Sequence, residues 1–402
     1  MDALSKSPGV DAVPRRRAWL ITALSLGGFA IGAGEFAVIG LMPELVREFG
    51  VSEPRVGHLI SAYALGVVVG APLLALLGGR LPRRRLLLAL MGFYALANLA
   101  TAFAAGHAGM LAWRFIAGLP HGAYFGVASL VAVAISPPHA RGKAVSLVML
   151  GLTLAILAGN PLATWMGQQI GWRWVFVAVA AVALASVAMI ALLMPADRAK
   201  PRQRRVADEL RAFNRLPVWQ ALLIGVIGFS GMFCVFSYIA PTLLHVTGVS
   251  AALIPLGLAG FGLGGVIGTM AGGRLFDRLR LRAAVVVLAG AAVVLALFPL
   301  LAGSLWTILP ATVAIGMLGA LGVILQTHLM DVAGAAQTLA AASHHAAFNA
   351  ANALGPWLGG MAINAGLGWT STGPVGAIAA LIGTALCLWA IATQRARAIR
   401  PS

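Results

Sequence analysis

Residues 19–42 read WLITALSLGGFAIGAGEFAVIGLM. The run carries one charged residue, Glu35, and is longer than the about 20 apolar residues that cross a bilayer as a helix. Eleven further apolar runs follow it, at roughly 56–78, 85–106, 109–136, 143–167, 173–194, 218–244, 252–274, 283–303, 305–330, 337–364 and 373–393. The sequence therefore predicts an all-α polytopic membrane protein with twelve transmembrane helices.

The composition of the whole chain agrees with this prediction. Hydrophobic residues make up 60% of the sequence and charged residues 10%, whereas soluble domains carry about 25% charged residues. An ordinary soluble protein, a disordered chain and a fibrous protein are therefore excluded. A transmembrane β-barrel would show short alternating strands, and these runs are continuous. Both cysteines, Cys234 and Cys387, lie within apolar runs, so we expect no disulfide, no metal site and no cofactor.

The 28 Lys and Arg residues are distributed unequally about the predicted spans. With the N-terminus in the cytoplasm, 24 of them fall in cytoplasmic segments, which is the bias that orients membrane proteins. Only Arg47, Arg55 and Arg173 fall outside, and Arg114 falls within a span. We therefore expect both termini to be cytoplasmic. Topology and contact with anionic lipids account for the net charge of +17, so no nucleic-acid partner is expected.

The longest polar interruption divides the chain into two halves. This interruption, residues 195–217, is basic and rich in proline. It separates a predicted six-helix bundle at 19–194 from a second one at 218–394, and tails at 1–18 and 395–402 flank the bundles.

Short motifs recur in the two halves at similar positions. Gly78-Gly79-Arg80-Leu81 after the second span matches Gly272-Gly273-Arg274-Leu275 after the eighth. Asn160-Pro161 in the fifth span is echoed by Gly355-Pro356 in the eleventh. Duplicated six-helix halves are typical of transporters that rock around a site near the middle of the membrane.

These features resemble the major facilitator superfamily, and within it the drug/proton antiporters of the bacterial sugar-efflux (arabinose-efflux-like) branch. Gly34-Glu35-Phe36 followed by Gly40-Leu41-Met42-Pro43 is similar to the opening of that branch. Arg114-Phe115-Ile116-Ala117-Gly118 is similar to the Arg-x-x-x-Gly motif of the antiporters. Gly355-Pro356-Trp357-Leu358-Gly359-Gly360 resembles their Gly-Pro-x-x-Gly-Gly motif, and Gly151 with Gly159-Asn160-Pro161 is a partial copy. The resemblance implies a bacterial inner-membrane location and conformational roles for Gly151, Gly159, Pro161, Gly355 and Pro356.

The cytoplasmic loop motif of the family, Gly-x-Leu-x-Asp-Arg, is complete in the second half only. There it comprises Gly273, Leu275, Asp277 and Arg278. In the first half the acid is missing, although a basic cluster that includes Arg80, Arg83 and Arg84 remains. In the family this loop is thought to latch the two halves together, so the resemblance implies a gating role for these residues. Asp331, at the inner end of the tenth span, is either part of such a latch or simply solvated.

Three residues are candidates for handling protons. An ionised group inside a span is costly unless it is paired or hydrated, so Glu35 is a functional candidate by default. Helix rise places Arg114 at a similar depth, and we expect an ion pair between the two side chains. His121 follows Arg114 by two helical turns on the same face, and histidine suits proton transfer. The alternatives are a structural ion pair, an arginine that reaches lipid phosphate, and a histidine that only joins helices.

Polar and aromatic stripes supply candidates for solute binding. Such stripes either hold helices together or line a wet cavity, and aromatic stripes often only pack. Amides and hydroxyls suit a neutral polyhydroxyl or heterocyclic solute better than a cation. The candidates are Tyr124 in span four, Asn160 and Thr164 in span five, Phe229, Phe233 and Tyr238 in span seven, Gln326 in span ten, and His345, Asn349 and Asn352 in span eleven.

The sequence favours a transporter over an enzyme. Gly228-Phe229-Ser230-Gly231 superficially resembles an intramembrane protease motif, but nothing in the sequence supplies the histidine base. No nucleotide-binding or dinucleotide-binding motif is present. We therefore predict a monomeric efflux transporter that exchanges a small solute, such as a sugar, drug or nucleoside, for protons by alternating access. The alternatives are an uncoupled facilitator and a lipid flippase of the same fold.

Overall fold

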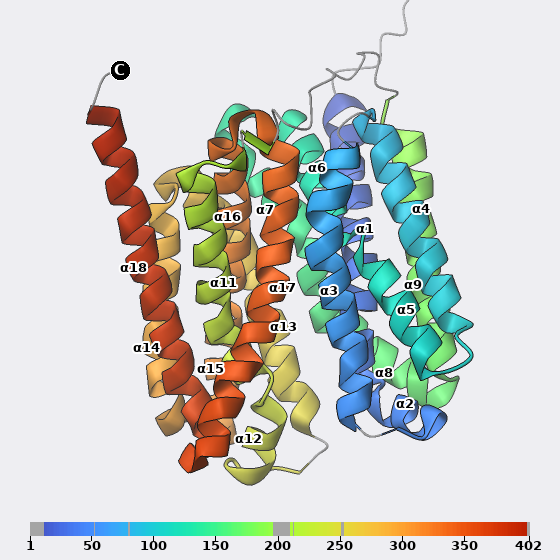
Figure 1. The fold of residues 1–402 in the computed structure, drawn as a ribbon, viewed down its shortest axis with the longest axis vertical. Coiled ribbons are helices and arrows are strands. Elements are labelled where there is room, and N and C mark those ends of the chain that lie inside the picture. Colours follow the sequence, from blue (N-terminus) through green and yellow to red (C-terminus); the bar gives the residue numbers. More distant parts are fainter. Residues whose placement is uncertain are drawn as a thin grey trace, which may run out of the picture.

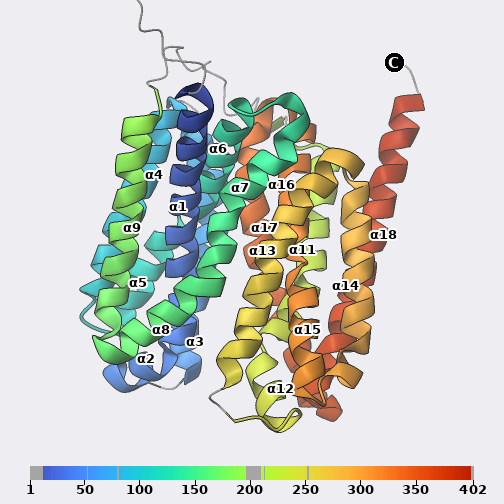
Figure 2. The same cartoon turned by 180° about the vertical axis from the view of Figure 1, so that it is seen from behind.

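The computed structural model describes residues 12–51, 53–78, 81–195, 210–211, 213–250 and 253–399. These residues form a bundle of long, roughly aligned helices (Figures 1 and 2). Eleven helical segments within them are long and apolar enough to cross a membrane. α1 begins and α18 ends on one side of the bundle, which we call the terminal side (Figure 1). α2, α8 and α12 lie on the opposite side.

The helices fall into two groups along the chain. The first half contains α1 (Ala12–Gly40), α2 (Met42–Phe49), α3 (Glu53–Gly78), α4 (Arg83–Ala102), α5 (His107–Gly118), α6 (His121–Ala134), α7 (Arg141–Leu154), α8 (Asn160–Gln169) and α9 (Trp172–Leu193). The second half contains α11 (Leu216–Phe236), α12 (Ile239–His245), α13 (Ile254–Leu279), α14 (Arg282–Leu301), α15 (Leu305–Gly316), α16 (Gly319–Val332), α17 (Gln337–Ala362) and α18 (Thr372–Ile399). Most of the central loop that separates them, and Arg80, lie outside the described residues.

Several predicted spans are interrupted helices. The fifth span consists of α7 and α8, joined by a π-helical turn at Ala155–Gly159 directly before Pro161. Proline lacks an N–H and cannot continue the regular bonding pattern, which accounts for the interruption at this point. The fourth span breaks between α5 and α6, where Leu119 and Pro120 separate the two pieces.

α17 is the predicted eleventh span, but it is not among the eleven sufficiently apolar segments. It is 26 residues long. His344, His345, Asn349 and Asn352 interrupt its apolar stretch. It packs among α3 and α6 of the first half and α11 and α16 of the second half. The long helix that lacks a sufficiently apolar stretch among the described residues therefore lies at the interface between the halves (Figure 1).

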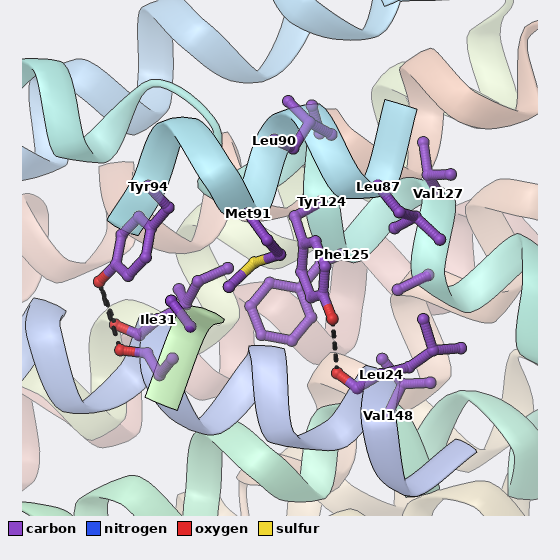
Figure 3. Packing of buried hydrophobic residues seen from close by; sticks show 14 of the residues in the cluster. Leu24, Ile31, Leu87, Leu90, Met91, Tyr94, Tyr124, Phe125, Val127 and Val148 are labelled. Carbon is purple, nitrogen blue, oxygen red and sulfur yellow. Dashed lines mark hydrogen bonds between the residues drawn. The ribbon is translucent and has the colours of Figure 1, made fainter. Parts of the chain in front are cut away.

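Each half has an apolar core of its own. In the first half Leu24, Ile31, Met91 and Phe125 are buried together with their neighbours, as Figure 3 shows. In the second half Phe229, Leu288 and Phe298 belong to a separate cluster. Two smaller clusters contain residues of both halves, and they pack the ends of α3, α6 and α7 that lie near the terminal side against α16 and α17. The halves are therefore two packed units joined along a narrower apolar contact.

Candidate functional site

A cavity of about 680 Å³ lies between the two halves. Its walls come from α1 and α3 on one side and from α11, α12, α13 and α17 on the other. The lining residues belong to the parts of these helices that lie away from the terminal side, so the cavity opens toward the opposite side. Its volume is within the range of sites for small molecules.

Glu35 is the acidic side chain in the wall of this cavity. Only 3% of it is exposed, and neither carboxylate oxygen has a hydrogen-bond partner among the described residues. The nearest ionisable partner is His121, whose Nδ1 lies 3.8 Å from Glu35 Oε2. A carboxylate in such surroundings is costly as a lone charge, so proton binding is the chemistry that this position favours.

Arg114 differs from the expected side-chain ion pair. Its guanidinium donates to the main-chain carbonyl oxygens of Gly34, at 2.6 Å, and of Glu35, at 2.9 Å. It also stacks on Tyr63, 4.4 Å from the ring centre, and is completely buried. Among the described residues no ion pair within 4.0 Å joins Arg114 to the Glu35 carboxylate. Helix rise correctly predicted that the two residues lie at the same depth. The guanidinium nevertheless bonds main-chain carbonyl oxygens, which have spare lone pairs, and not the carboxylate.

His121 begins α6 and is fully buried. The Tyr63 hydroxyl lies 3.1 Å from its Nδ1. Its Nε2 lies 3.1 Å from Nδ1 of His345 on α17, which belongs to the other half. His345 reaches Gln326 on α16, and Gln326 donates back to Ser129 on α6. Three of the predicted polar residues thus form one buried row across the interface.

The predicted solute-binding residues divide into those near the cavity and those away from it. Asn349 and Asn352 line the cavity beside Phe36 and Phe236. Phe229 and Phe233 line an adjoining apolar pocket, where both pack against Phe348. These placements suit contact with a solute that is partly polar and partly apolar.

Five predicted binding residues line neither the cavity nor the adjoining pocket, whereas His345 borders that pocket. Gln326 belongs to the buried row. Tyr124 is buried inside the first half, where its hydroxyl donates to the Leu24 carbonyl at 2.8 Å (Figure 3). Asn160 and Thr164 lie on α8, where the Thr164 hydroxyl donates to the Asn160 carbonyl. The Tyr238 hydroxyl donates to the Pro356 carbonyl. These hydroxyls bond main-chain acceptors within their own half, and solute contact at the five positions stays a prediction.

The terminal side is closed by polar contacts between the halves. Asp277 on α13 accepts main-chain hydrogen bonds from Gly142 and Lys143 at the start of α7. Asp331 on α16 pairs with Arg141 of the first half at 2.8 Å and with Arg280 at 3.5 Å. Both aspartates therefore join the halves on this side.

The basic cluster of the first half is placed differently from Asp277. Arg84 donates to the Ala191 carbonyl at 2.6 Å, within its own half. Arg83 and Arg278 are exposed, and Arg80 lies outside the described residues. The contact between the halves at this level therefore comes from the loop motif of the second half, which is the copy that retains its acid.

The predicted glycines and prolines occupy close helix contacts. A Cβ on Gly273 would come within 2.7 Å of the Gly142 carbonyl in the other half. Gly151 lies against α1, and Gly355 lies against α11, where a Cβ would come within 2.6 Å of the Phe233 Cβ. Gly159 ends the π-helical turn that precedes Pro161. Pro356 lines the cavity.

Several cavity residues were not predicted. Tyr63, Ser61 and Phe36 line it from the first half, and Ser237 lines it from the second. Tyr63 could have been found, because it is one of only four tyrosines in the sequence and lies in the middle of an apolar run. Phe36 belongs to the Gly34-Glu35-Phe36 motif, but no binding role was assigned to it there, and Ser61 and Ser237 carry no distinguishing pattern in a chain of this composition.

Two helical halves around a cavity that opens on one side and is closed on the other define a membrane transporter. The model of the Major Facilitator Superfamily matches residues 24–343. The chain is 38% identical over 375 residues to "Inner membrane transport protein YdhP" of Escherichia coli K12, covering 92% of this chain and 94% of that protein. It is 27% identical to a "Probable sugar efflux transporter" of Helicobacter acinonychis, covering 91% and 92% of the two chains.

A solved structure shares the same fold. The structure of the proton:xylose symporter XylE, bound to 6-bromo-6-deoxy-D-glucose, superposes with a TM-score of 0.73 at 18% identity, covering 92% of this chain and 95% of that one. The chain therefore belongs to the Major Facilitator Superfamily. It is a multi-pass membrane transporter and not an enzyme.

Proposed function

We propose that this chain exports a small solute across the bacterial inner membrane in exchange for one or two protons. The observation that carries the proposal is Glu35, a buried carboxyl in the wall of the cavity between the halves that has no hydrogen-bond partner within the described part of the chain. A group of this kind can hold either a proton or a donor group of the solute, and competition between the two is sufficient for antiport. The efflux direction is supported by the relative described in name as a sugar efflux transporter.

The membrane orientation follows the distribution of basic residues. The positive-inside bias favours a cytoplasmic terminal side. The cavity would then face the periplasm, where the solute is released and protons enter. Asp277 and Asp331 would form the cytoplasmic closure, and we propose that the protein works as a monomer, since one chain supplies both walls of the cavity.

The chemistry of the cavity wall narrows the solute class. Beside Glu35 it offers the amides of Asn349 and Asn352 and the hydroxyls of Ser61 and Ser237, together with aromatic and aliphatic surface. None of the described residues that line it is basic. An anionic solute would find no counter-charge there, so the site favours a neutral polyhydroxyl or heterocyclic compound with hydrogen-bond donors.

Proton release from the purified protein tests the proposal. Sugars, nucleosides and antibiotics are added one at a time to wild type, Glu35→Gln and the control Glu48→Gln, since Glu48 is exposed and pairs with Arg173. We expect one compound class to release protons from wild type and Glu48→Gln but not from Glu35→Gln. Direct binding without proton release from wild type would overturn antiport and favour a facilitator or a flippase.

A further inference from the structure

A row of buried polar side chains crosses from the first half to the second and back. His121 Nε2 lies 3.1 Å from His345 Nδ1, and His345 Nε2 lies 3.1 Å from Gln326 Oε1. The Gln326 amide nitrogen then donates to the Phe125 carbonyl at 3.3 Å and to the Ser129 hydroxyl at 2.6 Å. His121, Phe125 and Ser129 lie on α6, whereas Gln326 and His345 lie on α16 and α17.

The Phe125 carbonyl at the end of the row determines which group donates and which accepts in each hydrogen bond of the row. The Phe125 carbonyl can only accept, so it faces the NH₂ group of Gln326, and the amide oxygen must face His345. That oxygen can only accept, so His345 carries its hydrogen on Nε2, and its Nδ1 is a bare acceptor. His121 must therefore donate from Nε2. A neutral imidazole has one N–H, so Nδ1 of His121 carries a lone pair that can accept a hydrogen bond or a proton.

The lone pair on His121 Nδ1 faces the proton site of the cavity. Glu35 Oε2 lies 3.8 Å from Nδ1, and the Tyr63 hydroxyl donates to it at 3.1 Å. Glu35 reaches the cavity, whereas His121 is fully buried. Within the row a proton from Glu35 passes to this nitrogen, because the Tyr63 hydroxyl can rotate away from it, whereas the other ring nitrogens are held in the bonds between the two rings and Gln326.

We infer that His121 and His345 form a second proton site, loaded from Glu35, that holds the two halves together when empty and releases them when filled. This inference rests on the proposed function. In the transfer, the O–H bond of Glu35 breaks and an N–H bond forms at His121 Nδ1, which leaves a carboxylate and an imidazolium. The Nε2 proton of His121 can then move to His345 Nδ1. The row ends at Gln326, because a neutral amide oxygen is too weak a base to take the proton on.

The charge balance around the pair decides the direction of the effect. Among the described residues, four titratable or charged groups face the histidine pair: Glu35 on α1, Tyr63 on α3, Arg114 on α5 and His344 on α17. Tyr94 on α4 instead donates its hydroxyl to carbonyl oxygens of α1. Without the proton, the Arg114 cation and the Glu35 anion cancel. One proton gives the buried group a net positive charge, and its transfer from Glu35 to the rings leaves that total unchanged but creates a separated carboxylate and imidazolium. A stronger charge-assisted bond between the rings offsets part of the cost of this separation, but the desolvation of two buried charges is larger.

The loaded pair is therefore stabilised by water, which separation of the halves on the terminal side would admit. Separation breaks the His121–His345 bond and exposes both rings to that side, where the proton can leave. In the closed arrangement His345 borders the small apolar pocket beside Phe229 and Phe233, and α6 and α17 are in close contact: a Cβ on Gly126 would come within 3.0 Å of the Ala342 main chain. Proton entry from the cavity and opening of the opposite gate are thus coupled through one imidazole pair.

The distance between the halves tests this inference. Spin labels replace the exposed Arg85 and Arg282 near the terminal side in a Cys234→Ala, Cys387→Ala background, with the full chain in lipid nanodiscs. Between about pH 8 and about pH 5, a range that spans the titration of a hydrated histidine such as the separated state exposes, we expect the wild-type distance distribution to shift toward longer values. His345→Gln keeps a hydrogen-bonding side chain but cannot take the proton, and should lose at least half of the shift. The matched control is His344→Gln, the neighbouring buried histidine, which should retain it.

A second variant tests the charge argument itself. Gln326→Glu places an anion at the end of the row, which would compensate the loaded pair. The low-pH shift toward longer distances should disappear in this variant while the purified protein still takes up protons. A wild type without any shift, or a His345→Gln variant that retains it in full, overturns the inference. The two proposals can fail separately. If His345→Gln retains the shift while Glu35→Gln abolishes solute-driven proton release, the second proton site is wrong and the proposed antiport stands. If no solute releases protons from wild type, the proposed antiport is wrong, and the inference that rests on it is lost as well.

Discussion

The Asp277 carboxylate of α13 accepts a 2.8 Å hydrogen bond from the main-chain N–H of Gly142, in the other half of the molecule. It lies 3.2 Å from the N–H of Lys143 as well, so one carboxylate caps the first turn of α7. The free N–H groups and the positive end of the helix dipole make this position favourable for an anion. Closure of the terminal side is therefore asymmetric, with the acid supplied by the second half.

Replacing Asp277 by Ala should weaken this closure. A hydrogen bond to a charged group contributes about 1.5 kcal/mol at the lower end of its range, which is roughly a tenfold change in the ratio of the two conformations. A Ser61→Cys probe in the cavity should then react more slowly with a membrane-impermeant maleimide, because the cavity is open in fewer molecules. Arg278→Ala, an exposed neighbour, serves as control and should react at the wild-type rate. Equal rates for both variants would show that Asp277 does not set this equilibrium.

Gly273→Ala should act on the same equilibrium by steric means. The new Cβ would lie 2.7 Å from the Gly142 carbonyl and 2.8 Å from the Ser146 hydroxyl, so the two halves could not approach as closely. We expect transport to fall roughly tenfold, from a shift of about 1.4 kcal/mol, in a steady-state uptake assay with inverted vesicles. Gly290→Ala on α14 is the matched control, since no atom lies within 4 Å of its Cβ. It should retain transport, and helix propensity predicts a stability gain of up to about 1 kcal/mol.

Arg114→Lys should destabilise the first half although it keeps the positive charge. An ammonium cannot reach two carbonyl oxygens and stack on Tyr63 at the same time. Loss of the partners of a buried charge costs about 3–5 kcal/mol. We expect a clearly lower Tm in detergent and no transport. Arg173→Lys, at an exposed pair with Glu48, should cost less than about 1 kcal/mol. A wild-type Tm for Arg114→Lys would contradict the structural role of the guanidinium.

Asn352→Ala and Tyr124→Phe should separate binding from stability. Asn352 lines the cavity, so its loss should raise the KM of the transported solute about tenfold, equivalent to one hydrogen bond of about 1.4 kcal/mol. Tyr124 lies inside the first half, so removal of its hydroxyl should leave KM unchanged and lower stability by about 1 kcal/mol. Transport kinetics and thermal unfolding of both variants check the assignment, and a raised KM for Tyr124→Phe would place that residue at the solute after all.

The sequence predicted the elements of the fold better than the partners of individual side chains. Apolar runs and basic loops located the spans, and Pro161 marked the break in the fifth, because these properties depend on local composition. Helical spacing also grouped Asn160 with Thr164 and His345 with Asn349. Spacing identifies which residues share a helix face, but not which neighbouring helix that face meets. Thus the Thr164 hydroxyl of the first stripe bonds a carbonyl of its own helix, whereas the second stripe reaches the interface and the cavity.

The role of Arg114 shows the same limit at the level of atoms. Helix rise predicted that Arg114 lies at the same depth as Glu35, and the structure agrees. Whether a guanidinium meets the carboxylate or the carbonyls of its neighbour depends on side-chain rotamers and on close approaches such as that at Gly34, where a Cβ would meet the Tyr94 hydroxyl. No pattern in a single sequence encodes that choice.

The polarity of α17 bears on how the protein is made. A segment enters the bilayer alone only if its summed transfer free energy is favourable, and polar side chains near the centre oppose entry. α17, with its buried histidines and asparagines, is the long helix that falls short of that condition among the described segments. During synthesis it should therefore be retained beside the insertion machinery until α3, α6, α11 and α16 can receive it, and the terminal helix α18 should enter the lipid as its partner. Final assembly of the two halves thus waits for the helix that joins them.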